Sequence, residues 1–246
     1  MNTWQLIRKW RRNLFFDEIE TGFALEDLRE QGNWTLILVI PLGIIYVVVT
    51  IISLIITNRR CPDSVYIGWL AYGRSLVIDS QNNYFFVDIW GRRINGQVFT
   101  EAYAFTQGFA WVRDKDGRYY HIQPNGQPAY QGTFIWVNSF SDGRCLVKDD
   151  DGLCYHIDGN GQAIYSERYP DGSSFSEGFA WMKVSQEGED KQYIVIDSNG
   201  RPVRPEIFRF HTDFCGGRCG PVTVDGRKDD LIITPEGKIE FVPRQW

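Results

Sequence analysis

The most extended hydrophobic pattern in the chain is a run of 24 uncharged residues from Trp34 to Thr57, WTLILVIPLGIIYVVVTIISLIIT. As an α-helix rising 1.5 Å per residue, this run would be roughly 36 Å long, which exceeds the ~30 Å hydrocarbon core of a bilayer. Pro41 and Gly43 are compatible with this interpretation, because both residue types are commoner in membrane helices than in soluble ones. The run is too long, and too far from the first residue, for a cleavable signal peptide. We therefore predict one transmembrane helix at residues 34–57.

A second pattern precedes this helix. At helical spacing, one side of this segment is apolar (Leu6, Ile7, Trp10, Leu14, Phe15) and the other side is basic. Such an amphipathic helix is typical of a segment that lies on an anionic membrane surface, although a solvated or partner-bound helix has the same pattern. The residues expected at the membrane surface are Arg8, Lys9, Trp10, Arg11 and Arg12.

Basic residues flank both ends of the span, so the positive-inside rule does not decide its orientation. The basic first helix favours a cytoplasmic N-terminus, with the rest of the chain in the periplasm or outside the cell. The reverse orientation would make the protein a scaffold that faces the cytosol.

Beyond the span, the chain repeats itself. The segment from Gly108, GFAWVRDKDGRYYHIQPNGQ, aligns without gaps with GRCLVKDDDGLCYHIDGNGQ from Gly143, an offset of 35 positions. The same register extends back to Gly73 and forward, after a short insertion, to Tyr193–Gly200; a degenerate copy covers Phe214–Gly237. Recurring markers are Phe105, Phe140, Phe175 and Phe214; Gly108, Gly143, Gly178 and Gly217; and Gly91, Gly126, Gly161, Gly200 and Gly237. Periods of this length are typical of stacked arrays in which neighbouring units complete each other's core.

Each repeat reads as β-structure. Two apolar runs flank a turn with Asp and Gly, as at Asp114–Gly117, which predicts a β-hairpin, and Thr133–Val137 suggests a third short strand. We predict an all-β tandem hairpin repeat array, either open and propeller-like or a short solenoid, preceded by one transmembrane helix and the amphipathic helix. The expected domains are 1–33 (amphipathic and juxtamembrane segment), 34–57 (transmembrane helix), 58–69 (linker) and 70–246 (repeat domain).

These residues resemble the bacterial WG-repeat, or KWG-repeat, family. The resemblance is carried by Phe-Ser-Glu-Gly-Phe-Ala-Trp at Phe175–Trp181 and by the later Tyr-x-x-Ile-Asp-x-x-Gly at Tyr193–Gly200, and it extends over about residues 70–240. The chain departs from the family where glycine usually follows the aromatic residue, because Phe85, Tyr120, Tyr155 and Ile194 stand there. The resemblance implies an interaction module and brings no shared catalytic residues.

Composition narrows the classes of function. The formal net charge is -5, so the chain lacks the basic footprint that nucleic-acid binding needs, and we expect no nucleic-acid partner. The equivalent residues His121 and His156, and the turn carboxylates Asp149–Asp151, have a structural explanation in the repeat itself. No nucleotide, metalloprotease or hydrolase motif occurs in a credible context. We therefore expect no catalytic residues, no metal, no cofactor and no enzymatic activity.

Five cysteines leave the redox state open. Cys145 and Cys154 fall on the two arms of one hairpin and could form a disulfide, although diagonal positions strain the bond and buried thiols are an alternative. Cys215 and Cys219, in FCGGRCG, are a second candidate pair if the repeat domain is outside the cytoplasm. The same segment gives the spacing His211-x3-Cys215-x3-Cys219, for which no fourth zinc ligand is evident.

The anchor, the array and the lack of catalytic motifs together favour an interaction protein. We expect an accessory or assembly subunit of a membrane complex in the bacterial envelope, whose partners are protein subunits and the lipid bilayer. Trp111, Trp136 and Trp181 are the candidate binding residues, because tryptophan is enriched in binding hot spots; Trp111 and Trp181 share a register and could equally be core. The alternatives are an envelope module that binds glycans or peptidoglycan fragments, and the cytosolic scaffold.

Overall fold

The apolar run forms a single helix in the computed structural model. Helix α2 spans Trp34–Arg60 and ends on Arg59 and Arg60, whose positive charges suit the carbonyl end of a helix. Within the described chain, only its segment Gly43–Arg60 is long and apolar enough to cross a membrane. The structure describes residues 34–185, 191–209, 212–224, 227–234 and 238–243. The predicted amphipathic helix, with Arg8, Lys9, Trp10, Arg11 and Arg12, lies outside the described residues, as does His211.

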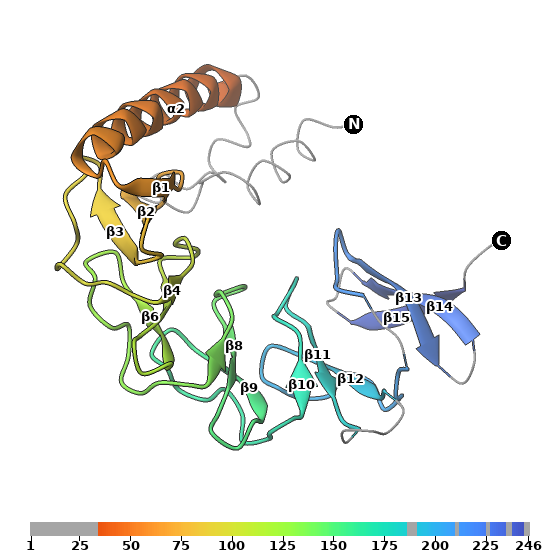
Figure 1. Ribbon diagram of the computed structural model, residues 1–246. Helices are drawn as coiled ribbons and strands as arrows, with labels where there is room; N and C mark the ends of the chain where they lie inside the picture. The colour runs from red at the N-terminus through yellow and green to blue at the C-terminus, as the bar shows by residue number, and fades with distance from the viewer. Residues whose placement is uncertain (1–33, 186–190, 210–211, 225–226, 235–237, 244–246) are drawn as a thin grey trace. The chain divides into compact units, whose positions relative to one another are not determined.

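After the helix, the described chain forms short antiparallel strands (Figure 1). Residues that favour strands, mostly β-branched and aromatic, alternate with turns rich in Asp, Asn and Gly, so the predicted β-repeat fold is confirmed at this level. The strands are β1 (Ser64–Ile67), β2 (Arg74–Asp79), β3 (Tyr84–Asp88), β4 (Glu101–Ala102), β5 (Ala110–Arg113), β6 (Tyr119–Ile122), β7 (Trp136–Val137), β8 (Cys145–Lys148), β9 (Cys154–Ile157), β10 (Asp171–Gly172), β11 (Ala180–Lys183), β12 (Tyr193–Ile196), β13 (Arg218–Val224), β14 (Arg227–Ile233) and β15 (Ile239–Pro243).

The chain divides into two compact units, and the first, Met1–Gly108 with Pro124–Gly126, contains α2 and the sheet β1–β2–β3. Strand β1 pairs with β2, with Ile67 opposite Val77. The predicted linker 58–69 is therefore corrected: it holds the last turn of α2 and the outer strand of the first sheet. Sequence reasoning missed this strand because SVYI is only four residues long and carries none of the repeat's glycine or phenylalanine markers.

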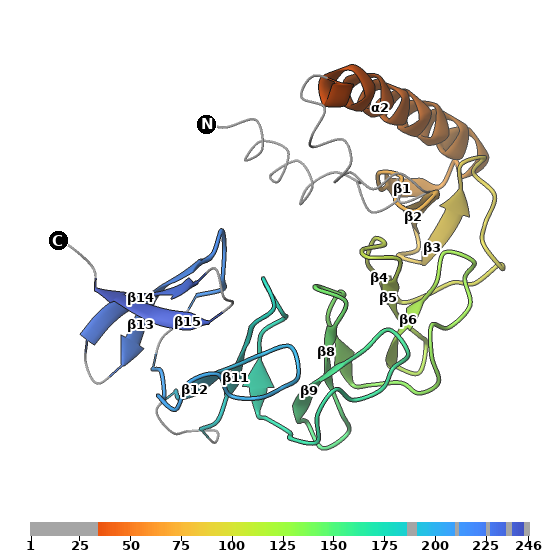
Figure 2. The same cartoon turned by 180° about the vertical axis from the view of Figure 1, so that it is seen from behind.

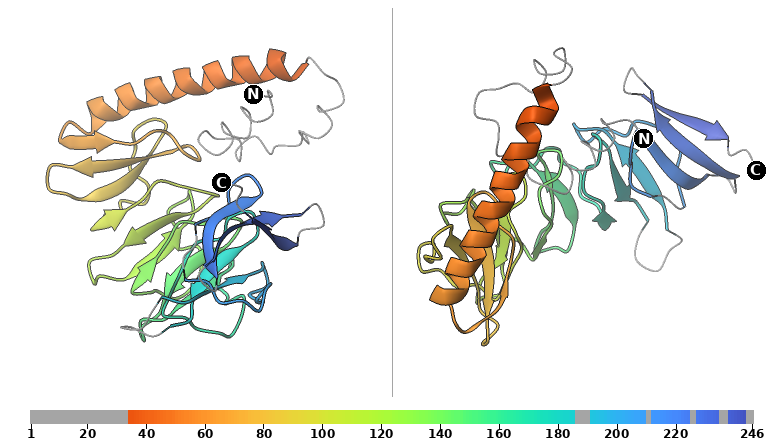
Figure 3. Two further views of the ribbon diagram at one scale, coloured as in Figure 1. Left: turned by 90° about the vertical axis from the view of Figure 1, so that its right-hand side faces the viewer. Right: turned by 90° about the horizontal axis from the view of Figure 1, so that it is seen from above.

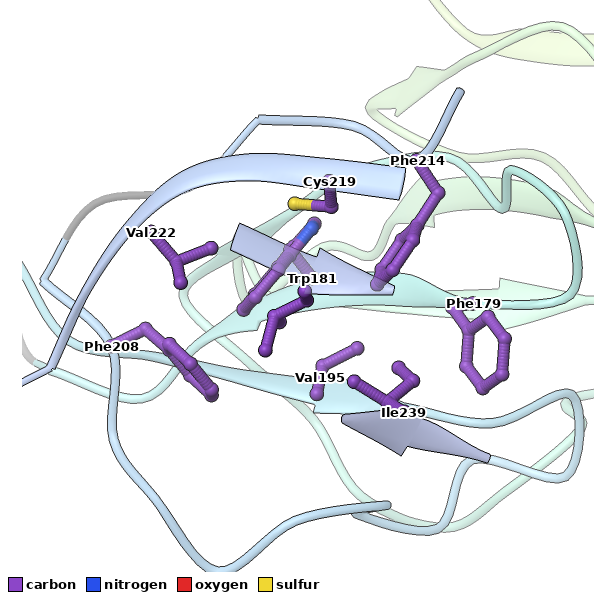
Figure 4. Close-up of a cluster of buried hydrophobic side chains, with 9 residues drawn as sticks. Phe179, Trp181, Val195, Phe208, Phe214, Cys219, Val222 and Ile239 are labelled. Carbon is purple, nitrogen blue, oxygen red and sulfur yellow. The ribbon is translucent and has the colours of Figure 1, made fainter. Parts of the chain in front are cut away.

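The second unit, Phe109–Gln123 with Gln127–Trp246, contains the hairpin β5–β6 and the sheets β7–β8–β9, β10–β11–β12 and β13–β14–β15 (Figure 2). Its core consists of clusters that join consecutive repeats. In the last cluster, Trp181 and Val195 from one sheet pack with Cys219 and Val222 of the next, and Phe208 comes from the segment that joins the two sheets (Figure 4). Each sheet thus depends on its neighbour in the chain for burial, as expected of stacked repeats.

An aspartate closes the turn of the β5–β6 hairpin and that of the β8–β9 hairpin. Asp114 Oδ1 accepts hydrogen bonds from the amides of Asp116 and Arg118, both at 2.9 Å. Asp149 Oδ1 in the next repeat accepts two amides in the same way, at 3.1 and 3.0 Å. These aspartates therefore stabilise the turns, and the described residues contain no group of three or more His, Cys, Asp or Glu side chains that could hold a metal ion.

Recurring contacts also join the repeats of unit 2 at their glycine turns. Ser141 Oγ donates to the carbonyl of Phe175, and Ser176 Oγ donates to that of Phe214, each at 2.7 Å. Glu177 accepts the amides of Gly216 and Gly217, both at 2.8 Å. The repeat is thus held to its neighbour by polar side chains that reach backbone groups, as well as by the apolar clusters.

Candidate interaction surface

Buried histidines form part of the joints between repeats in unit 2. His121 on β6 is 1% exposed. Its Nδ1 lies 2.5 Å from the hydroxyl of Tyr130, and its Nε2 lies 2.8 Å from the carbonyl oxygen of Asn138. Because a carbonyl only accepts, Nε2 carries the proton and donates it to Asn138, while Nδ1 accepts from Tyr130. Both ring nitrogens are therefore bonded within the protein.

His156, at the equivalent position on β9, repeats this arrangement. Its Nδ1 lies 2.6 Å from the hydroxyl of Tyr165 and its Nε2 lies 2.9 Å from the carbonyl of Ser173. Burial lowers the pKa of His121 and of His156 to about 4, and the hydrogen bonds to the carbonyls offset only part of this effect. Both imidazoles are neutral at pH 7 and enclosed, which is the arrangement of a structural joint.

The third joint uses a tryptophan. Trp181 on β11 lies opposite Val195 on β12, and its Nε1 donates to the carbonyl of Thr212 at 3.0 Å. Its side chain is 1% exposed and belongs to the last core cluster. The prediction that Trp181 could anchor a partner is therefore wrong, because a fully buried ring with a satisfied N–H has no surface to offer.

The other two candidate tryptophans differ from each other. Trp111 on β5 is half-buried and packs against the cluster that contains Val147 and Ile157, so it is largely a core residue. Trp136 on β7 is 39% exposed. Of the three predicted binding residues, Trp136 presents the most accessible ring.

The cysteines do not form the predicted disulfides. Cys145 lies opposite Ile157, whereas Cys154 lies opposite Lys148, so the two thiols occupy opposite ends of the β8–β9 hairpin. That is three residues along the strands, or roughly 10 Å, which is beyond the reach of a disulfide. Both are free and buried, and burial raises the pKa of Cys145 well above its usual range and that of Cys154 to about 11.

Cys215 and Cys219 are not joined by a disulfide either. Cys219 is buried and its Sγ donates to the carbonyl of Thr212 at 2.7 Å, while Cys215 is exposed. The second predicted pair is thus corrected as well: the glycine turn between the two residues starts a strand, β13, which holds Cys219 in the core. Cys215 is the one cysteine of the chain in the exposed class.

An apolar patch lies on the outer strand of the sheet β7–β8–β9. Ile135 and Trp136 are each 39% exposed, and β7 is the edge strand of this sheet. The neighbouring repeats carry Thr100–Glu101 and Pro170–Asp171 at the same register. The fold therefore does not require a large apolar residue here, since the position of Trp136 is taken by Glu101 and Asp171 in these repeats.

Charged and polar groups border this patch. Trp136 lies opposite Lys148 on β8. Arg118 donates to Thr133 Oγ1 at 3.0 Å and pairs with Asp150 at 2.5 Å, which ties the preceding hairpin to the segment that leads into β7. We call Ile135 and Trp136, with Lys148, Arg118 and Asp150, the β7 edge patch. An apolar centre with a charged rim is the usual anatomy of a protein interface.

Other exposed apolar residues were not singled out by the sequence pattern. Ile135 was missed because an isoleucine in a short strand reads as core. In unit 1, Val65, Tyr66, Trp69 and Trp90 are 51% to 67% exposed. Comparing each repeat position with its equivalents could have identified these residues, because they differ from the residues found there in other repeats.

Comparison with known proteins supports the repeat family. Residues 98–119, which include β4 and most of the β5–β6 hairpin, match the family described as the WG containing repeat. This match confirms the resemblance recognised in the sequence. Comparison with curated proteins gave no match.

Several solved structures share limited similarity. The computationally designed Ika8 protein is 12% identical, with 74% of this chain and 71% of that chain covered and a TM-score of 0.40. BamB from Moraxella catarrhalis is 10% identical over 71% of this chain and 62% of its own, with a TM-score of 0.37. The WD40 beta propeller domain of Doa1 is 14% identical over 70% and 65%, with a TM-score of 0.32. The chain spans less than two thirds of the length of BamB and of the Doa1 domain.

Proposed function

We propose that this protein is a membrane-anchored interaction protein without catalytic activity, an accessory or assembly subunit that docks a protein partner of a membrane complex through its β-repeat array. The observation that carries this proposal is the β7 edge patch, where Trp136 on the edge strand β7 and Ile135 just before it are exposed. The WG containing repeat supports the coarser statement that the array serves binding.

The patch suits a protein partner for a physical reason. An exposed apolar edge strand is a site for unwanted pairing with other chains, and natural sheets usually protect such edges with charged residues. The repeats with Glu101 and Asp171 follow this rule, whereas the repeat with Trp136 departs from it. A partner that covers Trp136 would bury a large aromatic side chain of the kind that dominates interface energies.

The buried polar groups support a role other than catalysis. His121 and His156 are neutral at pH 7 and use both ring nitrogens inside the joints. Burial raises the pKa of the thiols of Cys145 and Cys154, which keeps them protonated at pH 7 and poorly nucleophilic. These groups, the ones that a sequence search would choose first for chemistry, serve the packing of the array.

In this proposal α2 crosses the membrane once, with the N-terminus in the cytoplasm and the array in the periplasm or outside the cell. The repeats would form either an open, propeller-like curl or a short solenoid.

The test is to purify the tagged full-length protein from its native membrane in mild detergent, and to compare it with the double variant I135T/W136E. This variant installs the residues of the neighbouring repeat, Thr100 and Glu101, so it removes the apolar patch at a position where the fold accepts polar side chains. The readouts are the particle mass and the stoichiometry of the proteins that accompany the chain. We expect stoichiometric companions with the wild-type protein and their loss with the variant.

A matched control is I207T, which removes another exposed apolar residue of unit 2 and installs the residue of an earlier repeat, Thr133. It should keep the companions, and both variants should unfold at the wild-type temperature. A wild-type particle that contains this chain alone would overturn the stable-subunit proposal, and it would favour the alternative of an envelope module that binds glycans or peptidoglycan fragments.

A further inference from the structure

The second half of helix α2 lies along the first sheet in unit 1 (Figures 1 and 3). The hydroxyl of Tyr46 donates to the carbonyl of Leu70, just after β1. Near the end of the helix, the turn after β3 packs so closely that a Cβ on Gly91 would lie 3.1 Å from the Cα of Thr57. At 1.5 Å per residue, these two contacts are about 17 Å apart along the helix. The sheet is therefore held beside a long stretch of α2, not only at its end.

In this position α2 takes the place of a preceding repeat. A Cβ on Gly161, the glycine equivalent to Gly91, would lie 2.6 Å from Cγ of Tyr130 in the repeat before it. In the first repeat, Gly91 instead meets Thr57 and Arg60 of α2. The same contact recurs in the remaining equivalent pairs, Gly126 with Ile94 and Gly200 with Tyr165. Helix α2 thus serves as the cap that the end unit of a stacked array needs.

A helix in this position cannot cross a bilayer. With the sheet beside residues 46–57, only residues 34–45 are clear of it, which is roughly 18 Å of helix. The hydrocarbon core is ~30 Å thick. A spanning helix would therefore carry the sheet and its outer strand β1 into the hydrocarbon, where open sheet edges do not occur because their backbone groups find no partners. Either α2 caps the array or it crosses the membrane.

The sheet and a bilayer would cover different surfaces of α2. On the sheet, Thr50, Ser53 and Thr57 are at most 1% exposed, and the described structure gives their hydroxyls no hydrogen-bond partner. Burying a polar group without a partner is unfavourable. The apolar side chains that stay 38% to 59% exposed are Ile44, Ile45, Val47, Val48, Val49, Ile51, Ile52 and Ile55. A bilayer would bury these side chains, so it competes with the sheet for the helix.

The first sheet is built to remain folded when α2 leaves. It has an apolar cluster of its own, whose members are Val77, Phe85, Val87, Cys61 and Ile67. All of them come from the sheet or from the residue that follows the helix. The connection between helix and sheet is residues 61–63, where Pro62 prevents the helix from continuing into the strand. This short connection is the place about which α2 can turn away.

We propose that α2 has two mutually exclusive positions: on the first sheet, where it caps the array, and across the bilayer, where it has left the sheet. Entry into the membrane therefore uncovers the face of the sheet on which Thr50, Ser53 and Thr57 had packed. This inference rests on the membrane anchoring in the proposed function. It adds that anchoring changes the end of the array.

The test locks α2 on the sheet before the chain meets lipid. The double variant V49C/W69C places one cysteine at the border of the covered helix face and one next to Leu70, in a background with C61S and C215S. Cell-free synthesis without lipid supplies the full chain, and a bismaleimide with a reducible disulfide in its spacer bridges the pair. Phospholipid nanodiscs are then added, and co-purification with the discs measures insertion.

We expect the bridged chain to stay outside the nanodiscs and to enter them once the bridge is reduced. The single variants V49C and W69C, which carry the reagent without a bridge, are the matched controls and should enter. Shielding of the buried Cys145 and Cys154 from maleimide checks that the array is folded in every sample.

A second variant changes the balance without a bridge. Y46F loses the hydrogen bond to Leu70 and keeps the ring, so it should enter nanodiscs about twofold to tenfold faster than the wild-type chain. Y66F, which removes a hydroxyl from the exposed strand β1, is its control and should match the wild type.

Two results would overturn the exclusive positions: a bridged chain that enters nanodiscs as completely as the reduced one, or a cysteine pair that does not bridge without lipid. Single-cysteine controls and a wild-type chain that never enter nanodiscs would instead overturn the membrane anchoring itself.

Discussion

Trp181 and Val195 face each other across β11 and β12, and this pair occupies the same register as Leu146 and His156 one repeat earlier. In the earlier repeat His156 donates a hydrogen bond to the carbonyl of Ser173. In the later repeat Trp181 Nε1 donates to the carbonyl of Thr212, which is the equivalent position. The joint therefore keeps its buried hydrogen bond while the donor moves from one strand of the hairpin to the other. What recurs between repeats is a satisfied carbonyl, not a particular side chain.

Replacing Trp181 with phenylalanine should destabilise the protein by about 2–3 kcal/mol, because the carbonyl of Thr212 loses its stronger donor and keeps only the thiol of Cys219, and a cavity opens in the core. Trp111→Phe at the equivalent position is the control. The Trp111 ring is half-buried, and in its repeat His121 donates the hydrogen bond to the carbonyl of Asn138. The free energy of unfolding should therefore fall by less than about 1 kcal/mol. Urea unfolding of both variants measures the difference. Equal losses would show that the hydrogen bond to Thr212 contributes little.

The two buried histidines should make stability fall with acidity. In the unfolded chain an imidazole binds its proton near pH 6.5, whereas burial lowers the pKa of His121 and His156 to about 4 in the folded protein. Between these values the unfolded state binds more protons, so the free energy of unfolding decreases as the pH falls through this window. The expected loss is about 2–3 kcal/mol between pH 7 and pH 5.5.

Urea titrations at a series of pH values measure this loss. His156→Phe, which installs the residue found at the equivalent position of an earlier repeat, Phe86, should roughly halve the dependence on pH whatever its effect at pH 7. A wild-type protein whose free energy of unfolding is constant over this range would contradict the assigned neutral histidines.

Gly161 tests the contact between glycine turns and the tyrosines of the preceding repeat. Its φ is +77°, and a Cβ there would lie 2.6 Å from Cγ of Tyr130. Gly152 has the same φ of +77° but nothing within 4 Å of its Cβ position. Alanine at Gly152 should therefore cost about 1–2 kcal/mol for the backbone conformation alone, and alanine at Gly161 about 1–3 kcal/mol more. Calorimetric unfolding measures the stability of both variants, and the difference between them is the effect of the clash with Tyr130. Equal losses of stability would show that Tyr130 moves aside freely.

Much of this fold is readable from local patterns. The apolar run gives α2, and the Asp and Gly turn residues give the hairpins because their side chains and backbone freedom act within a few residues. The repeat register also places Trp111 and Trp181 at equivalent positions. It does not tell which of them is buried, since that depends on Phe208 and Phe214 from the following repeat, which cover Trp181.

The candidate site was predicted less well for a related reason. Cys145 and Cys154 appear close in a hairpin drawn from sequence, but the register that separates them is set by how the two strands pair. Trp136 was found because tryptophan is conspicuous. Trp69 and Trp90 were not singled out because their neighbours Leu70 and Gly91 contact α2, and such contacts between residues far apart in the sequence are not visible in a local pattern.

Cys215 provides a measurement of orientation. It is exposed, whereas Cys145, Cys154 and Cys219 are buried and Cys61 is only partly accessible beside α2. The experiment adds a membrane-impermeant maleimide to cells whose outer membrane is permeabilised and whose inner membrane is intact. If the array lies outside the cytoplasm, the reagent should label the wild-type protein through Cys215. Cys215→Ser should abolish most of this labelling, because the remaining thiols are shielded by packing. Labelling of Cys215 only after the inner membrane is disrupted would reverse the orientation, and it would make the protein a scaffold that faces the cytosol.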